Sequence, residues 1–458
     1  MSQTLPMDGL PIPQRYGAIL AIALGLTVAV LDGAIANIAL PTIARELQAS
    51  PAQSIWIVNA YQLAIIVSLL SLSFLGDILG YRRIYQWGLV IFSCTSLLCA
   101  LSSSLEMLTF ARVLQGFGGA ALMSVNTALI RIIYPQRHLG RGIAINSLIV
   151  AVSTAAGPTV AAAVLSVASW QWLFFINLPV GIAALCLALR FLPDNPQKAQ
   201  GQRFDIASAV MNALTFGLLI AALSGVAQGQ RWEIIAAELA ALLIVGVLFI
   251  RRQLTLPFPL LPVDLLRIPI FSLSICTSVC SFCAQMLAMV SLPFYLQSVL
   301  GRDEVATGLL LTPWPLATMV MSPIAGRLIE RYHAGLLGGV GLTMFAAGLF
   351  ALALLPAAPG DLDIIWRMML CGAGFGLFQS PNNHTIISSA PRNRSGGASG
   401  MLGTARLLGQ TSGAALVALM FNLFDTHGTH ASLILAGCFS SAAAMVSTMR
   451  LMQPRAGK

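Results

Sequence analysis

Long runs of apolar residues alternate with short polar breaks along almost the whole chain. A helix that crosses a bilayer needs about 20 mostly apolar residues, and the polar breaks divide the chain into fourteen runs of that kind. The first run is too long for the core of a signal peptide and is expected to stay in the protein. We therefore predict fourteen transmembrane helices, at roughly 16–40, 53–75, 84–103, 105–130, 142–168, 172–192, 206–226, 233–251, 270–299, 305–330, 335–355, 364–388, 396–424 and 430–450.

The composition excludes most classes of soluble protein. Of the 458 residues, 57% are hydrophobic and only 9% are charged, and the mean hydropathy is +0.84. Soluble domains carry about 25% charged residues, so a cytosolic enzyme, a secreted disulfide scaffold and a disordered protein are all excluded. The fold class predicted is an all-α integral membrane protein.

The net charge of +9 is explained by membrane topology. Cytoplasmic loops collect Lys and Arg, and with the N-terminus inside, the inner loops and tails hold nineteen of the 25 basic residues. The outer loops hold only Arg45, Arg231 and Arg302. Neither of the two lysines, Lys198 and Lys458, follows a glycine-rich phosphate loop. We therefore expect both termini in the cytoplasm, and neither nucleic acid nor nucleotide as a partner.

A faint internal repeat divides the chain into two bundles. Gly76–Arg83 follows the second run, and Gly326–Arg331 follows the second of the last six runs. Two six-helix bundles that a repeat relates, with two helices between them, are typical of rocker-type secondary transporters. The predicted limits are a cytoplasmic tail at 1–15, the first bundle at 16–192, a linker at 193–205, the inserted pair at 206–251, a linker at 252–269, the second bundle at 270–450 and a tail at 451–458.

Asp32 is the candidate proton carrier. It lies about sixteen residues into the first run, roughly 24 Å along a helix. An ionised carboxylate at that depth costs about 2.5–3.5 kcal/mol, so burial favours the neutral form and allows uptake and release of a proton. Arg112, expected at a similar depth, could bias Asp32 directly, through Gln115 or through water, without losing its own proton. The alternatives are a permanent ion pair for Asp32, and carbonyl contacts that orient the fourth helix for Arg112.

A short inner loop after the second run is the candidate gate. Gly76 and Gly80 permit a tight turn that carries Asp77, Arg82 and Arg83. We expect Asp77 to accept hydrogen bonds from the N-terminus of a helix in the other half, which would latch the outward-facing state. Positive-inside anchoring explains the arginines equally well but leaves Asp77 unexplained.

Four polar or aromatic residues form the candidate substrate cavity: Asn37, Gln115, Trp314 and Arg406. Trp314 lies between two prolines near mid-membrane, where it could stack on an aromatic or cationic substrate or fill a broken helix. Arg406, deep in the thirteenth run, must face a cavity or a partner and could attract an anionic substrate.

Two other features are assigned to the helices themselves. Gly157-Pro158 in the fifth run removes a backbone hydrogen bond and is expected to bend the helix, with close packing as the alternative. Cys276, Cys280 and Cys283 share one helical face, but without a nearby histidine or carboxylate they are expected to pack against a neighbouring helix. No metal or other cofactor is predicted.

Five motifs follow one another along the chain: Leu31–Pro41, Gly76–Arg83, Arg112–Gly119, Gly157-Pro158, and Trp170-Gln171-Trp172 with Asn177-Leu178-Pro179. In this order they resemble the major facilitator superfamily, and within it the fourteen-span drug:proton antiporters. Four positions depart from the family pattern: Ser73 stands where the inner-loop motif opens with glycine, and Ser153 and Ala161-Ala162 replace three glycines of the antiporter motif.

The resemblance implies a non-enzymatic secondary transporter that exports small amphipathic or drug-like molecules in exchange for protons by alternating access. Its expected partners are a small-molecule substrate, protons and the lipid bilayer, and it is expected to be a monomer in a bacterial inner (plasma) membrane. In this interpretation Asp32 and Arg112 couple the protons, with Glu238 and His384 as weaker candidates for the carrier. Two alternatives stay open: a proton-coupled exporter of an anionic metabolite, favoured by the number of deep arginines, and a non-transporting membrane receptor or scaffold.

Overall fold

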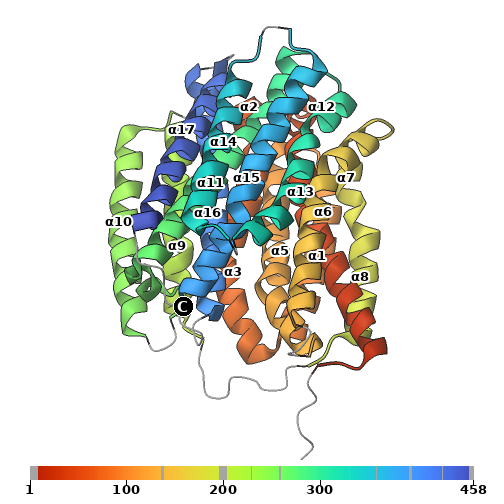
Figure 1. Ribbon diagram of the computed structural model, residues 1–458. Helices are drawn as coiled ribbons and strands as arrows, with labels where there is room; N and C mark the ends of the chain where they lie inside the picture. Colours follow the sequence, from red (N-terminus) through yellow and green to blue (C-terminus); the bar gives the residue numbers. More distant parts are fainter. Residues whose placement is uncertain are drawn as a thin grey trace, which may run out of the picture.

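The computed structural model describes residues 9–135, 139–194, 204–227, 229–256, 259–329, 331–356, 358–390, 395–424 and 427–452, and the regular structure within these ranges is entirely helical. Figure 1 shows the long helices running side by side in one direction or its reverse. Below, the upper end of the molecule is the end with α2 (Pro51–Ser54) and α12 (Glu304–Leu311). The lower end is the one where α1 (Ile12–Glu46) begins.

Each of the fourteen predicted ranges falls, within a few residues, on one helix or on two consecutive helices. The first bundle also contains α3 (Trp56–Leu79), α4 (Tyr81–Ala100), α5 (Leu105–Ile133), α6 (Leu139–Leu165), α7 (Gln171–Phe175) and α8 (Asn177–Phe191). The inserted pair is α9 (Ile206–Ala227) and α10 (Trp232–Thr255). The second bundle contains α11 (Pro269–Phe294), its π-helical extension η3 (Tyr295–Val299), α12, α13 (Pro313–Leu328), α14 (Ala334–Ala353), α15 (Asp361–Ser389), α16 (Ser395–Phe424) and α17 (Gly428–Met449).

Twelve helical segments of the described chain are long and apolar enough to cross a membrane. The predicted spans on α4 and α15 are outside that set. The helix α4 opens with Tyr81-Arg82-Arg83, and α15 carries Asp361 and Asp363 in its first turn. The prediction of fourteen spans therefore goes beyond what length and composition establish.

The helix bounds move the predicted domain limits by a few residues. The first bundle begins at Ile12 rather than at residue 16, because Pro11 and Pro13 fit the first turn of a helix. The helix α10 extends to Thr255, four residues beyond the predicted end of the inserted pair. The tails at 1–8 and 453–458, most of the linker at 195–203, and the basic residues Arg137, Arg392 and Arg394 lie outside the described residues.

Polar residues and glycine in the sequence mark the ends of several helices. Ser50 and Gln53 form a capping box at α2, with each side chain bonded to the other's backbone nitrogen at 3.2 and 2.9 Å. The carboxylate of Asp303 caps α12 by accepting from Ala306 N at 2.6 Å. Gly80 joins α3 to α4 with φ of +111°, a backbone conformation that side chains other than glycine rarely adopt.

The inserted pair lies at one side of the two bundles. The helix α9 contacts both α3 of the first bundle and α16 of the second, while α10 packs mainly on α9. Asn212 of α9 donates to Val67 O of α3 at 3.0 Å, and Leu407 of α16 shares an apolar core with α3 and with Phe216 of α9. The helix α9 therefore covers one of the two lines along which the bundles meet.

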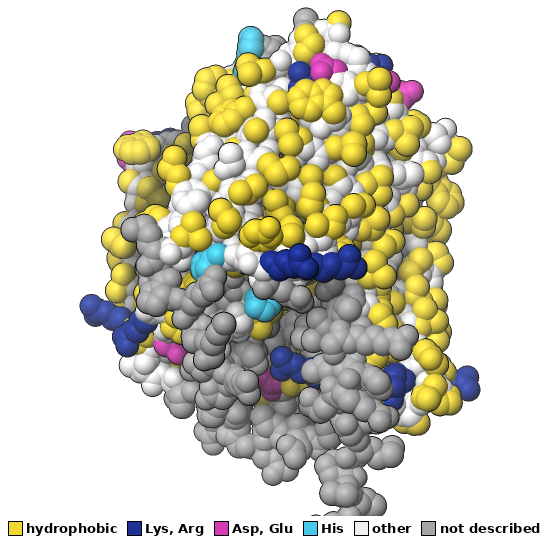
Figure 2. All heavy atoms as spheres, in the orientation of Figure 1, with side chains coloured by type: hydrophobic (Ala, Val, Ile, Leu, Met, Phe, Trp, Pro, Cys, Tyr) yellow, Lys and Arg dark blue, Asp and Glu magenta, His cyan; other side chains and the backbone are white. Residues whose placement is uncertain are grey.

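The surface agrees with a membrane setting. Figure 2 shows hydrophobic side chains over the upper half and the right-hand side of one face, with the larger groups of Lys and Arg at mid-height and below. Large apolar side chains such as Leu243 and Val320 are more than half exposed in the middle of their helices. Such side chains are stable facing lipid tails and would be costly in water.

A charged clamp holds the lower ends of α9 and α10 together. Asp205 precedes α9, caps it through Ser208 N at 3.3 Å and accepts two hydrogen bonds from Arg252 of α10 at 2.9 and 3.1 Å. The bonded Arg252 guanidinium is the main reason that the pKa of Asp205 falls to about 2, and the Ser208 hydroxyl adds to the effect.

Asp205→Asn is expected to lower thermal stability slightly at neutral pH. The pair is partly exposed, so its loss should cost less than about 1 kcal/mol. Because the folded-state pKa is lowered, the contribution is fully present above the ordinary aspartate pKa of about 3.9 and lost as the pH falls through about 2. The difference in melting temperature between the variant and the parent protein should be the same at pH 5 and pH 8, and smaller at pH 3. Glu233→Gln on exposed α10 surface is the matched control. A gap that widens at pH 3 would contradict the clamp.

Candidate functional site

Asp32 of α1 lies at the centre of a fully buried polar network in the first bundle. Its Oδ2 accepts from Arg112 Nη1 of α5 at 2.5 Å. Its Oδ1 accepts from Gln115 Nε2 at 3.1 Å and from Asn177 Nδ2 at 2.8 Å. Asp32, Arg112, Gln115 and Asn177 are each no more than 2% exposed. Four helices, α1, α4, α5 and α8, meet at this point, because Gln115 also donates to Ser96 of α4 at 2.8 Å.

Arg112 is held on every side by the first bundle. Its Nε donates to Ile57 O of α3 at 3.2 Å, and its Nη1 also donates to Gln115 Oε1. The guanidinium carbon lies 4.1 Å from the ring centroid of Tyr61 and 5.6 Å from that of Phe174. Planar stacking and several simultaneous hydrogen bonds are interactions that arginine makes and lysine does not.

Within this network Asp32 and Arg112 form an ion pair with no net charge, and both residues are almost completely buried. Of the routes that the sequence allowed, the structure has the direct contact between Arg112 and Asp32, together with a bridge through Gln115. Buried ion pairs of this kind keep both charges only while the geometry is intact, because a buried charge without its partner is strongly unfavourable.

In the predicted gate loop, Asp77 and Arg82 contact residues of the first bundle and of the segment that follows it. The hydroxyl of Tyr81 donates to Asp77 Oδ1 at 2.5 Å. Arg82 donates to Leu189 O of α8 at 2.6 Å and lies 3.6 Å from Asp194. Arg83 is exposed at the start of α4. In the described part of the chain, Asp77 therefore does not make the expected contact with the second bundle in this conformation.

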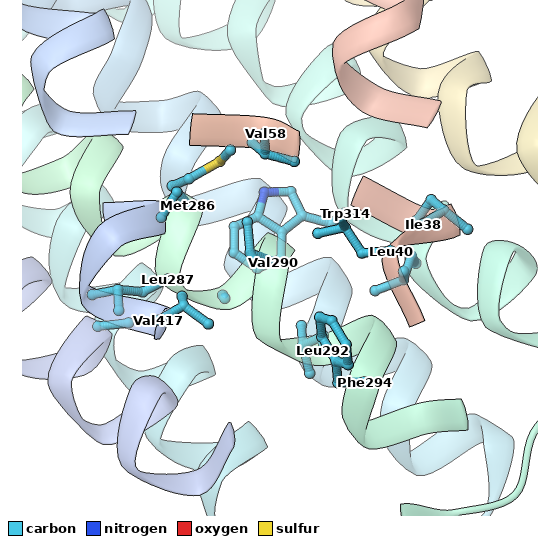
Figure 3. Close-up of a cluster of buried hydrophobic side chains, with 14 of the residues drawn as sticks. Ile38, Leu40, Val58, Met286, Leu287, Val290, Leu292, Phe294, Trp314 and Val417 are labelled. Carbon is cyan, nitrogen blue, oxygen red and sulfur yellow. The ribbon is translucent and has the colours of Figure 1, made fainter. Parts of the chain in front are cut away.

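At the upper end, by contrast, the two bundles are joined directly. Arg45 of α1 forms an ion pair with Glu304 of α12 at 3.1 Å. Thr42 also donates to Glu304 Oε1 at 3.1 Å, and Gln297 Nε2 of η3 donates to Ile38 O at 3.3 Å. Trp314 lies at the same boundary, where Figure 3 shows it beside Val58 and Ile38 of the first bundle. The upper end is closed in this conformation.

Gly157 and Pro158 lie where α6 packs against both α1 and α12. The helix α6 continues through Pro158 as far as Leu165. A Cβ at Gly157 would lie 2.4 Å from Ala34 Cβ, and one at Gly308 of α12 would lie 2.5 Å from Pro158 O. The glycine-proline segment therefore permits two close helix contacts, one of them between the bundles.

Gly308→Val is expected to shift the protein toward a state that is open at the upper end. The added side chain would overlap the backbone of α6. The helices α6 and α12 would therefore have to move apart, and the close contact of the closed state would be lost. Spin labels on cysteines at the exposed Leu101 and Leu362, in a background without the native cysteines, should report longer distances between the bundles. Gly217→Val on α9, where a Cβ meets nothing within 4 Å, is the matched control. An unchanged distance distribution would contradict the assignment.

The other predicted cavity residues are unpaired polar groups. Asn37 Oδ1, Trp314 Nε1 and Arg406 Nε are buried and make no hydrogen bond with the described part of the chain. Trp314 is 1% exposed and packs edge-on against Phe345 at 5.4 Å, at the point where Thr312 separates α12 from α13. Gln115, in contrast, belongs to the Asp32 network.

The two weaker candidates for a proton carrier are distant from this network in the fold. Glu238 is on the peripheral helix α10, and its Oε2 is buried without a hydrogen-bond partner among the described residues. His384 is exposed on α15 of the second bundle. Neither is in contact with Asp32 or Arg112 in this conformation.

Several residues of these sites were not predicted. Asn177 stands in a recognised motif but carries no charge that would mark it as a partner of Asp32. Ser96 and Tyr61 look like ordinary helix residues in the sequence. Arg45 and Glu304 are loop-adjacent charges, and only their opposite signs could have suggested the upper ion pair.

Comparison with known families gives one match that covers most of the chain. The model of the Major Facilitator Superfamily matches residues 22–414. This range includes the Asp32 network, the gate loop and the closing contacts at the upper end.

The chain is similar along nearly its whole length to curated transporters. An uncharacterized transporter of Escherichia coli (strain K12), YebQ, is 75% identical over 98% of both chains. The riboflavin transporter RibZ of Clostridioides difficile (strain 630) is 29% identical over 89% of this chain and 88% of its own. The tetracenomycin C resistance and export protein of Streptomyces glaucescens is 32% identical over 88% of this chain and 76% of its own.

Solved structures agree in fold. A crystal structure of a POT family transporter in complex with a thioalcohol-conjugated peptide superposes with a TM-score of 0.73, over 98% of this chain and 99% of that one. The sequence identity is 14%, so this likeness concerns the arrangement of helices alone.

Proposed function

The chain belongs to the major facilitator superfamily of transporters, and on that premise we propose that it exports small amphipathic, drug-like molecules in exchange for protons. The observation that carries the proposal is the buried contact between Asp32 and Arg112, one titratable and one permanently charged group at the meeting point of four helices. Similarity to export proteins, including the tetracenomycin C exporter, supports the direction of transport.

The proposed coupling uses the ion pair as a switch. While Arg112 is bonded to Asp32, the carboxylate stays charged and holds no proton. A conformational change that withdraws Arg112 leaves an isolated buried carboxylate, which takes a proton from whichever side is then open. Each proton that moves inward supplies about 2.3 kcal/mol per 100 mV of membrane potential.

We further propose fourteen membrane spans with both termini in the cytoplasm of a bacterial cell. The agreement of the fourteen predicted ranges with helices and the concentration of Lys and Arg in alternate loops support this topology. In that orientation the upper end faces outward, and the structure corresponds to a state closed to the outside.

Asp77 is then proposed to act in the opposite state, as a cytoplasmic latch. Asp77→Asn should change the rate or balance of inward–outward exchange, because the carboxylate would contact the other half in one state alone. Affinity in a trapped state should stay nearly constant. Distance measurements between the bundles, with and without substrate, test this. Loss of binding with unchanged exchange would contradict a latch.

The test of the proposed function is transport in reconstituted liposomes. A thermal-shift screen of amphipathic cations, anions and neutral compounds first identifies a ligand of the purified protein. An imposed pH gradient should then drive that ligand to a higher concentration on one side, with proton movement in the opposite direction. Transport that only equalises the two sides would contradict proton exchange.

The anionic alternative has a specific observation in its favour. Arg406 is a cation in the second bundle with no carboxylate in contact in the described structure, whereas Asp32 is already matched by Arg112. Among the described residues, the deep charge of this pair that no carboxylate balances is thus the positive charge of Arg406.

A further inference from the structure

Arg406 is the feature of the second bundle that the proposed function leaves unexplained. It lies on α16, and its guanidinium carbon is 5.8 Å from the ring centroid of Phe282 of α11. Its Nε is buried and without a hydrogen bond, and in the described chain the guanidinium has no ion-pair partner. Arg406 is therefore a half-buried cation inside the bundle, and a cation there is unfavourable unless a ligand supplies the opposite charge that the described residues do not.

Arg450 is the fully buried arginine at the end of this bundle, and it shows what a purely structural cation looks like here. Arg450 donates to Ser274 Oγ at 3.0 Å, to Asn382 Oδ1 at 2.7 Å and to Ser447 Oγ at 2.5 Å. These neutral oxygens satisfy the guanidinium and fix it between α11, α15 and α17. Among the described residues Arg406 has no such set of partners, although it is on a helix that packs very closely against α11, where Gly409 and Gly413 approach the carbonyls of Val279 and Cys283.

Two more buried polar groups near the same stretch of α11 have no hydrogen-bond partner among the described residues. Gln62 of α3 reaches across the boundary between the bundles to Met286, with its Nε2 3.9 Å from the sulfur, and its Oε1 is buried without a partner. Trp314 Nε1 is also unpaired, and Figure 3 shows the nitrogen edge of its indole between Met286 and Val58. Phe282 and Met286 are one helical turn apart, about 6 Å.

An aromatic path joins the two ends of this region. Phe282 packs on Phe375, Phe375 on Phe345, and Phe345 on Trp314, with ring centroids 5.5, 5.5 and 5.4 Å apart and edge-to-face angles of 71–80°. Edge-to-face contacts of this kind also accept a ring of a bound ligand. The region thus combines closely packed aromatic rings with two donors, the Arg406 guanidinium and the Trp314 N–H, and with the Gln62 carbonyl, which has no partner among the described residues.

We propose that this region, from Arg406 to Trp314, is the substrate site and that it takes small aromatic molecules bearing one negative charge, such as arene carboxylates. The proposal rests on the proposed transport function and names its substrate class. Arg406 binds the acidic group with charge-assisted hydrogen bonds, and Trp314 and Gln62 bind polar atoms on the ring system. The site is covered by α3 in the closed-upper conformation, so access follows the rocking of the bundles.

The test uses three probes with one ring system and different charge: 2-naphthoate, 2-naphthamide and 2-naphthylmethylammonium. Binding to the purified full-length protein in lipid nanodiscs is measured by calorimetry. The anion should bind at least about tenfold more tightly than the amide, and the ammonium most weakly. Arg406→Gln should remove the preference for the anion, Arg406→Lys should keep part of it, and Arg231→Gln on exposed surface should leave it intact.

A second measurement needs no ligand. If the role of Arg406 is to bind an anion, Arg406→Met should raise the melting temperature of the ligand-free protein, because a half-buried cation without a countercharge is removed. A lower melting temperature would identify a structural role and overturn the proposal. Equal affinity for the three probes, or binding by none, would overturn it as well.

The outcomes separate this proposal from the proposed function. If 2-naphthoate binds through Arg406 but a pH gradient does not drive its transport, the site stands and proton exchange falls. If a pH gradient drives transport of a neutral or cationic compound and 2-naphthoate has no advantage, proton exchange stands and the substrate class falls.

Discussion

Asp32→Asn is expected to abolish proton-driven accumulation of substrate while leaving downhill exchange in place. Asparagine has nearly the same shape as aspartate but cannot take up a proton at this position. Its side-chain oxygen can still accept from Asn177 or Gln115, so the packing around α1 need not collapse. In liposomes with an imposed pH gradient, the variant should bring the substrate to equal concentrations and no further.

The substitution also removes the countercharge of a buried arginine, and this effect must be separated from coupling. Loss of one partner of a buried ion pair costs about 3–5 kcal/mol, so the single variant should melt at a lower temperature. The double variant Asp32→Asn/Arg112→Gln removes both charges and should regain stability without regaining accumulation. A single variant that still concentrates substrate, or still releases protons when substrate binds, would assign the proton to another group such as Glu238.

Arg112→Lys is expected to reduce turnover by at least about tenfold, equivalent to about 1.4 kcal/mol in the barrier. Lysine keeps the positive charge, but one ammonium group cannot reach Ile57 O, Gln115 Oε1 and Asp32 together while stacking on Tyr61. The ion pair should therefore form with altered geometry, and the switch that controls the proton should be slow or incomplete.

The matched control for Arg112→Lys is Arg367→Lys. Arg367 is also paired with a carboxylate, Asp363, but lies at the first turns of α15, outside the network. Initial rates of gradient-driven transport, corrected for the amount of folded protein, provide the comparison. If Arg112→Lys and Arg367→Lys transport equally well, the planar guanidinium has no special part in coupling.

The positions of the helices and the central pair could be predicted because they depend on distance along the chain. Counting 1.5 Å per residue placed Asp32 and Arg112 at similar depths, and the structure has them in contact. Hydrophobic run length likewise located helices such as α9 and α16 within a few residues. These quantities need no knowledge of which helices are neighbours.

Contacts between distant helices could not be obtained in this way. The partner of Asp77 depends on which end of the bundles is closed, and the sequence is the same in every conformation. The pairing of Asn177 with Asp32 requires α8 to lie against α1, which no pattern within either helix indicates. Nor does the sequence show that Arg406 lies without a partner, since that follows from what surrounds it.

The position of α9 has a consequence for how lipid-dissolved compounds reach the interior. Two bundles that rock against each other have two lines of contact facing the bilayer. Along one of them α9 lies against both α3 and α16 and closes the gap to lipid. Along the other, α6 meets α12 and α13 directly, and the described helices provide no cover there. A compound dissolved in the membrane would therefore have one lateral path of entry between the bundles rather than two, on the side of Gly157 and Gly308.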